Sequence, residues 1–180
     1  MALTQLQVVN RALTEISRGN PVVNLTSTAD GIYAATLYQG AVELLLRDQD
    51  SEFSRKVATL NLSGGTAPLG WTYEYTYPAD CVRIRQVLPG TVDANDPQAT
   101  RWDEGTVGGV RMIWTDALSA KLVYTTNAVT ESEWDSMFAE RMVRYLGSQL
   151  ALPVAGRPDF SKEMLQIAGR IGSAAEGKDS

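Results

Sequence analysis

The sequence predicts an α+β protein in which an antiparallel helical bundle, made from N- and C-terminal helices, carries a small inserted antiparallel β unit. Toward both ends of the 180-residue chain, apolar residues recur every three or four positions, which is typical of amphipathic helices. From residue 71 onward, apolar and polar residues alternate instead, which is typical of half-buried strands. The predicted domains are residues 1–65 (N-terminal helices), 66–127 (inserted β unit) and 128–180 (C-terminal helices and flexible tail). The first and third segments pack together as one helical domain.

Three helices are predicted in the first segment. The first begins at Thr4, whose hydroxyl can cap the amide of Gln7, and it stops at Gly19-Asn20-Pro21. The second is capped by Ser27 or Thr28 and ends among residues 47–50. Its predicted inner face consists of Ile32, Leu37, Ala41, Leu44 and Leu45. The third runs from about Ser51 to Leu62 and ends at Ser63-Gly64-Gly65, where glycine readily adopts a left-handed cap.

An aromatic strand and the turn after it form the most distinctive stretch of the chain. In an extended backbone, Trp71, Tyr73, Tyr75 and Tyr77 lie on one face and the intervening polar residues on the other. Pro78 ends the strand because it has no N–H to donate, and Asp80 begins the turn into a second alternating run. We call Trp71, Tyr73, Tyr75, Tyr77, Pro78 and Asp80 the aromatic corner. The favoured interpretation is structural, a β corner packed on its neighbours, and the alternative is an aromatic platform for a ligand.

The rest of the middle segment predicts a long loop and more strands. Residues 89–100 are rich in Gly, Asp, Asn and Pro and predict an exposed loop. A short strand or turn follows around Arg101 to Asp103. Val110 to Trp114 and Lys121 to Thr125 are two further strands, which gives four or five in all. Gly105, Gly108 and Gly109 do not predict a phosphate loop, because no Gly-Lys-Ser/Thr follows them.

The last segment returns to helical periodicity. Thr130 or Ser132 caps a helix that runs to about Leu152 and is terminated by Pro153. Glu140, Arg141 and Arg144 could form an exposed ion-pair face on it, and the favoured interpretation is that they are solvated surface charges. A second helix runs from about Asp159 to Ala175, and the tail after Gly172 is expected to be loose until a partner orders it.

Composition excludes several classes of function. The chain has no histidine, which removes the commonest general base and zinc ligand, so we expect no enzyme activity, no cofactor and no metal. The single Cys81 is expected to be a buried thiol. Asp48, Asp50 and Glu52 are interpreted as a solvated helix start rather than a cation site. A net charge of −5 disfavours sequence-specific DNA binding, and we expect neither a membrane span nor a signal peptide.

The run W-x-Y-x-Y-x-Y followed by P-A-D-C-V-R-I, Trp71 to Ile84, resembles the tail tubular protein A family of short-tailed bacteriophages. Flanking segments match the family pattern in the same order, from Asn10, Ala12 and Leu13 through Leu44 to Leu46 and Val57 to Leu60, and then through Leu122 to Tyr124 and Trp134 to Pro153. One departure concerns the family's bulky aromatic pair after the leucine helix. Here Asp48 to Glu52 is acidic and only Phe53 is aromatic.

The resemblance implies a structural head-to-tail adaptor, a virion tail protein at the head-tail interface that is assembled in the host cytoplasm. Its partners would be the portal protein, other copies of itself in a dodecameric ring, and a tail nozzle or tail tubular protein B-like component. DNA would pass through the lumen without specific binding during genome ejection. By this analogy the portal contact involves Phe160, Met164, Ile167, Arg170 and Ile171, and the distal tail contact involves Asp93, Asn95 and Asp96.

Two alternatives remain open at this stage. A carboxylate-dependent cell-wall hydrolase needs two carboxyl groups in one cleft, one of them with a raised pKa, and Glu74, Asp80, Glu104 and Glu133 are candidates. An adaptor of the long-tailed phage connector type would be largely helical. For the adaptor itself we expect a monomer in isolation and a ring when a portal provides the template.

Overall fold

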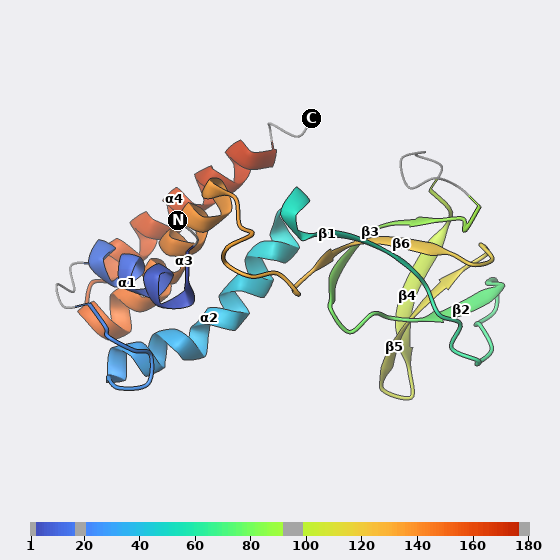
Figure 1. The fold of residues 1–180 in the computed structure, drawn as a ribbon, viewed down its shortest axis with the longest axis horizontal. Coiled ribbons are helices and arrows are strands. Elements are labelled where there is room, and N and C mark those ends of the chain that lie inside the picture. Colours follow the sequence, from blue (N-terminus) through green and yellow to red (C-terminus); the bar gives the residue numbers. More distant parts are fainter. Residues whose placement is uncertain (1–2, 17–20, 92–98, 177–180) are drawn as a thin grey trace. The chain divides into compact units, whose positions relative to one another are not determined.

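The computed structural model of the chain describes residues 3–16, 21–91 and 99–176. These residues form four α-helices and two three-stranded antiparallel sheets, so the protein is of the α+β class (Figure 1). The chain divides into two compact units. Residues 1–53 and 129–180 make up the first, which we call the helical unit, and residues 54–128 make up the second, the β unit.

The helical unit contains α1 (Gln5–Glu15), α2 (Ala29–Asp48), α3 (Ser136–Ala155) and α4 (Pro158–Glu176). Its first helix begins as predicted, because the Thr4 hydroxyl accepts from the Gln7 amide while the Gln7 side chain accepts from the Thr4 amide. Thr28 caps α2 by accepting from the Gly31 amide. The cap of α3 is Asp135 rather than Thr130 or Ser132, and its carboxylate accepts from the Phe138 amide at 2.7 Å.

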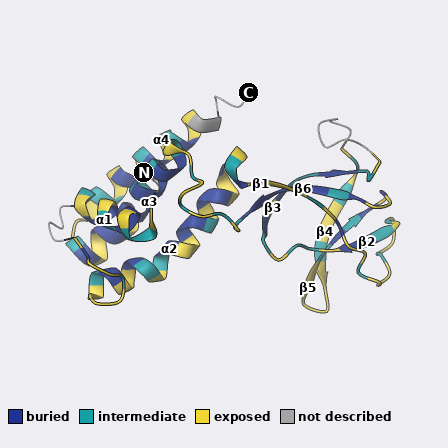
Figure 2. Ribbon diagram, viewed as in Figure 1, coloured by how far each residue is buried: buried dark blue, intermediate teal, exposed yellow. Residues whose placement is uncertain are grey.

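One continuous apolar core holds the helical unit together, and the buried positions line the inner sides of the helices (Figure 2). Both ends of the chain contribute to it. Its members include Val9, Leu13, Tyr38, Leu45, Leu46, Phe138, Met142, Leu146 and Leu150. An aromatic contact supports the core, with Phe53 packing edge-on against Phe138 at a centroid distance of 5.0 Å.

The β unit consists of two sheets. Strands β1 (Arg55–Thr59), β6 (Lys121–Thr126) and β3 (Cys81–Leu88) form one sheet in the order β1-β6-β3. Strands β2 (Tyr73–Thr76), β5 (Val110–Thr115) and β4 (Trp102–Val107) form the other in the order β2-β5-β4. Both sheets contribute side chains to one core that contains Tyr75, Ile84, Val87, Ile113, Leu122 and Tyr124. The β4–β5 hairpin turns at Gly108 and Gly109, whose φ values of 58° and 84° are strained for other residues.

The predicted third helix over residues 51–62 is wrong. Only Glu52–Ser54 forms a 3-10 turn, and Arg55–Thr59 is strand β1, paired antiparallel with β6 from Arg55 opposite Thr125 to Thr59 opposite Lys121. Residues 54–65, which the prediction assigns to the N-terminal segment, lie in the β unit.

Pro153 does not end α3 as expected. The helix continues to Ala155 and is closed by Gly156, whose φ is 65° and whose amide donates to the Leu152 carbonyl. A proline in the last turn costs little, because the hydrogen bond that it removes is near the frayed end of the helix.

Candidate assembly surfaces

Tyr75 is a core residue of the aromatic corner. Its side chain is 1% exposed within the β-unit core. The phenol donates to the Ala117 carbonyl at 2.8 Å and accepts from the Ala120 amide at 3.4 Å, so it satisfies two backbone groups between β5 and β6. This ring is therefore not available to a ligand, and the structural interpretation holds for it.

The other rings of the corner are only partly covered. Tyr73 and Tyr77 are half-buried and pack against the β-unit core, and Tyr73 lies 6.3 Å from Tyr75 between ring centroids. Arg111 lies over the Tyr77 ring at 3.8 Å, and Arg101 lies over the half-buried Trp71 ring at 4.2 Å. Two arginines thus occupy aromatic faces that a ligand platform would need.

Glu74 lies on the face that the alternation predicted to be polar and open, yet it is buried. The Ser63 hydroxyl donates to one carboxylate oxygen at 2.6 Å, and the Trp114 indole N–H donates to the other at 3.0 Å. These hydrogen bonds, first from Ser63 and then from Trp114, lower the pKa of Glu74. Neither partner could be inferred from sequence pattern, because they lie 11 and 40 residues from Glu74.

Asp80 connects three strands at the base of the corner. Its carboxylate accepts from Lys56 Nζ at 2.7 Å, from the Thr126 hydroxyl at 2.9 Å and from the Tyr124 phenol at 3.1 Å. Burial raises the pKa of Asp80, but the hydrogen bonds from Lys56, Thr126 and Tyr124 outweigh it, so the net shift is downward. The Pro-Ala-Asp part of the motif therefore ties the start of β3 to β1 and β6.

Burial also raises the pKa of the neighbouring Cys81 thiol, which is buried as expected.

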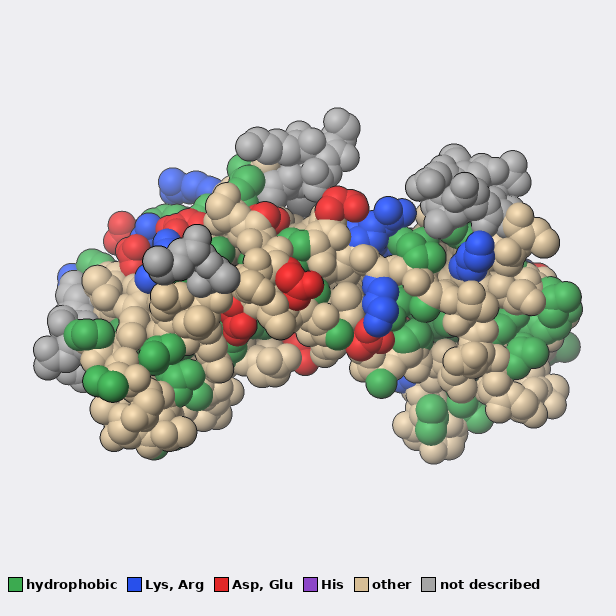
Figure 3. Space-filling view, viewed as in Figure 1, with side chains coloured by type: hydrophobic (Ala, Val, Ile, Leu, Met, Phe, Trp, Pro, Cys, Tyr) green, Lys and Arg blue, Asp and Glu red, His purple; other side chains and the backbone are tan. Residues whose placement is uncertain are grey.

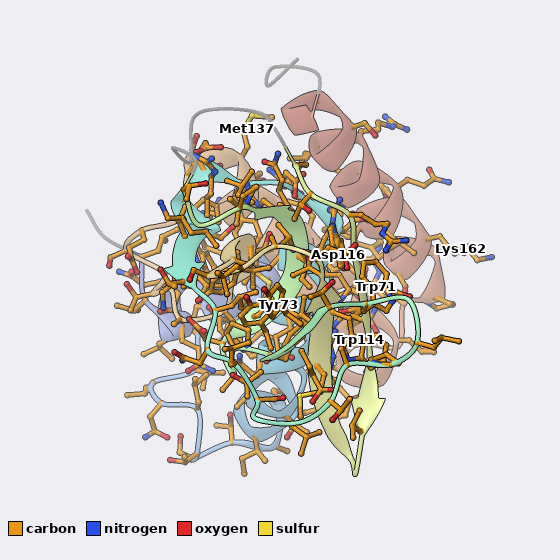
Figure 4. All side chains as sticks on the ribbon, turned by 90° about the vertical axis from the view of Figure 1, so that its right-hand side faces the viewer. Trp71, Tyr73, Trp114, Asp116, Met137 and Lys162 are labelled. Atoms are coloured by element: carbon orange, nitrogen blue, oxygen red, sulfur yellow. The ribbon has the colours of Figure 1, made fainter. Side chains whose placement is uncertain are left out.

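A braced turn precedes the aromatic strand. The Trp71 amide donates to the Pro68 carbonyl at 3.1 Å, and Gly70 takes a φ of 94°, as glycine does in type II turns. Arg101 donates to the Gly70 carbonyl at 2.8 Å and to Asp116 at 2.7 Å. Asp116 in turn accepts from the amide and hydroxyl of Thr72. Figure 4 labels Trp71 and Asp116, both of which Arg101 contacts. The sequence did not single out this turn, although Pro-Leu-Gly is a turn signal.

The predicted portal-contact residues lie on α4 but differ in exposure. Arg170 is exposed, whereas Phe160, Ile167 and Ile171 are half-buried and Met164 is buried. Phe160 packs against the helical core and also carries Arg157 over its ring at 3.7 Å. The apolar stripe of α4 thus mostly serves its own unit, as amphipathic stripes usually do.

Arg141 and Arg144 are not the solvated surface charges that the sequence favours. Arg141 is buried, pairs with Asp48 and donates to the Gln49 side chain at 3.3 Å. Arg144 links helices by bonding to Glu15 of α1 and, at 3.0 Å, to Glu140. The long aliphatic stem of an arginine allows its charged group to reach a partner inside the unit, which the pattern of charges along the sequence does not indicate.

Beside Arg141 the helical unit carries an open groove of about 350 Å³ between α2, α3 and α4. Leu44 and Leu165 at this groove are 48% and 49% exposed. The sequence predicts that Leu44 faces inward, but its side chain is exposed. The apolar face of α2 therefore extends beyond the part that the core covers. Leu45, Tyr145 and Ala168 complete the apolar lining, and Asp48 lies at its edge.

Several expected features lie outside these surfaces. Asp93, Asn95 and Asp96, the predicted distal contact, fall outside the described residues. Among residues 3–16, 21–91 and 99–176, no three His, Cys, Asp or Glu side chains are grouped so that they could hold a metal ion. In the same ranges, no helix is both long and apolar enough to cross a membrane.

Comparison of the chain with models of known protein families gave no match, and comparison with curated proteins gave no significant match.

Proposed function

We propose that the chain is a structural head-to-tail adaptor of a short-tailed phage, which forms a ring under the portal and a platform for the next tail component. The aromatic corner carries this proposal. Its Trp-x-Tyr-x-Tyr-x-Tyr and Pro-Ala-Asp-Cys sequence resembles the tail tubular protein A family, and each part has a physical role here. Tyr75 fills the core of the β unit, and Asp80 joins β1, β3 and β6.

The proposed architecture is an antiparallel helical bundle with an inserted β unit. In the adaptor, the bundle and the C-terminal helix would face the portal, and the β unit with its 89–100 loop would face a nozzle or tail tubular protein B-like component. The division of the chain supports this, because both chain ends build the helical unit and the β unit is one continuous segment. Of the predicted contact residues on α4, Arg170 and the partly exposed Phe160, Ile167 and Ile171 are the ones that a portal could still reach.

The charge distribution is consistent with a channel that DNA passes without sticking. The helical unit has nine Lys and Arg against fourteen Asp and Glu, whereas the β unit has seven of each. The whole net charge of −5 therefore belongs to the helical unit, and Figure 3 shows acidic side chains over it. Carboxylates on a lumen wall repel phosphate and prevent tight, sequence-independent binding.

The carboxylate hydrolase is less well supported. Its general acid needs a raised pKa, whereas the pKa values of three of the four candidates are lowered. Hydrogen bonds from Ser63 and Trp114 lower that of Glu74, those from Lys56, Thr126 and Tyr124 lower that of Asp80, and those from Thr130 lower that of Glu133. A largely helical connector of the long-tailed type fits poorly with the six strands of the β unit.

The proposal is tested by mixing the purified chain with rings of the portal protein from the same genome and measuring mass by sedimentation. We expect cooperative saturation of the portal by the full chain and loss of binding when the chain is truncated after Ile171. A second variant, the full chain with Arg170→Ala, keeps the tail and tests the contribution of the exposed α4 side chain alone. Absence of binding by the full chain would overturn the adaptor proposal.

A further inference from the structure

The braced turn, residues 68–71, carries a leucine that makes no contribution to the core of the β unit. Leu69, between Pro68 and Gly70, is fully exposed. Single exposed apolar side chains are common on protein surfaces, but this one stands on a turn fixed by Arg101 at Gly70 and Trp71 and by Asp116 at Thr72. A rigid turn loses little conformational entropy on binding, so Leu69 has the properties of a preorganised anchor.

The groove of the helical unit has the complementary form. It is concave, about 350 Å³ in volume, and lined mainly by apolar side chains with exposed Leu44 and Leu165 at its surface. The space is large enough for a leucine and its neighbouring proline. Asp48 at its edge is 62% exposed in its side chain although it pairs with Arg141.

We infer that the Leu69 turn of one copy docks into the α2/α3/α4 groove of the next copy. Charge supports a second copy as the occupant, because Arg101 beside Leu69 is 65% exposed in its side chain although it pairs with Asp116, and it would approach Asp48, which is also largely exposed. This contact deepens the proposed function by assigning the surfaces that join subunits in the ring.

The geometry has a distinctive consequence for assembly. Because the two surfaces are different, the contact is heterologous, and each copy that joins leaves a free groove or a free turn for another. Such a contact produces chains that grow beyond dimers and that can close into a ring. A symmetric contact would stop at two copies.

The test uses the full chain with Cys81→Ala, so that introduced thiols are the only ones. Leu69→Cys and Leu165→Cys are combined, the protein is concentrated, and a short thiol-specific crosslinker is added. We expect a ladder of dimers, trimers and larger species on denaturing gels. Each single-cysteine variant can form dimers at most. The matched control combines Leu165→Cys with Leu118→Cys, since Leu118 is an exposed leucine of the β unit outside the turn.

A ladder at least about tenfold stronger than that of the control pair supports the inference. The inference is overturned if the two cysteines crosslink only within one chain, if crosslinking stops at dimers, or if the ladder is no stronger than that of the control pair. As a non-covalent check, Leu69→Asp should weaken concentration-dependent association in sedimentation velocity by about tenfold or more, whereas Leu118→Asp should not. The outcome of this test can be distinguished from that of the portal experiment. If the chain binds the portal but forms no ladder, only this subunit contact is rejected. If it forms a ladder but does not bind the portal, the adaptor role is rejected.

Discussion

Truncation of Tyr75 should destabilise the β unit far more than truncation of an exposed side chain of the same unit. Tyr75→Ala removes a ring that is 1% exposed, and large aromatic truncations in cores cost about 3–5 kcal/mol. Tyr75→Phe keeps the ring but leaves the Ala117 carbonyl and the Ala120 amide without their partner, which costs about 1–3 kcal/mol. The hydroxyl should therefore account for a minor part of the effect, and the ring for the larger part.

The assay is urea unfolding followed by tryptophan fluorescence in a Trp134→Phe background. All other tryptophans, Trp71, Trp102 and Trp114, lie in the β unit, so the signal reports that unit alone. Leu118→Ala is the matched control, because this leucine also belongs to the β unit, is 61% exposed, and its truncation should change the free energy of unfolding by about 0.5 kcal/mol or less. A loss below about 1 kcal/mol for Tyr75→Ala would refute the core assignment. Unchanged stability together with failed assembly would identify the ring as part of a binding surface.

Three further predictions concern local contacts. Gly105→Ala should destabilise the β unit by about 1–3 kcal/mol in the same assay, because the added Cβ would lie 2.3 Å from the Trp114 ring and displace its bond to Glu74; a neutral result would contradict this packing. Asp80 has a lowered folded pKa, so its stabilising contribution is complete above about pH 4 and is lost as the pH falls through that lowered value. Urea midpoints between pH 2 and 7 should therefore fall less steeply below pH 4 for Asp80→Asn than for the unmodified chain, and parallel curves would exclude the effect. Asp135→Ala should cost the helical unit about 1 kcal/mol in thermal unfolding by circular dichroism, since it removes the cap of α3, and Asp135→Asn should restore most of it.

Local signals in the sequence predicted most elements of the fold. Thr4 and Gln7 form the expected capping box, and the alternation after residue 71 does mark strands. The error at residues 51–62 has a clear cause. Phe53, Val57 and Leu60 have helical spacing, yet propensity is a weak guide where a neighbouring strand supplies hydrogen-bond partners, and here β6 supplies them to Arg55–Thr59.

The candidate surfaces were harder to predict because they depend on contacts between distant residues. The burial of Glu74 requires Trp114, and the bracing of Leu69 requires Arg101. Arg141 appeared to be a solvated charge until Asp48, 93 residues away, was placed beside it. Sequence periodicity indicates that a residue lies on a face, but it does not indicate which partner covers that face.

The helical unit is built from two separate segments of the chain, so the two units must complete their folding in a fixed order during synthesis. Residues 54–128 leave the ribosome as one continuous segment that contains all six strands, so the β unit can fold while the chain is still being made. The helical unit cannot complete its core until α3 emerges, because Phe138, Met142 and Leu146 fill it. Until then α1 and α2 carry apolar surface that has no native cover. Nascent chains stalled when residues 54–128 have left the ribosome but α3 has not should therefore hold a protease-resistant β unit next to N-terminal helices that are still open to cleavage and to chaperones.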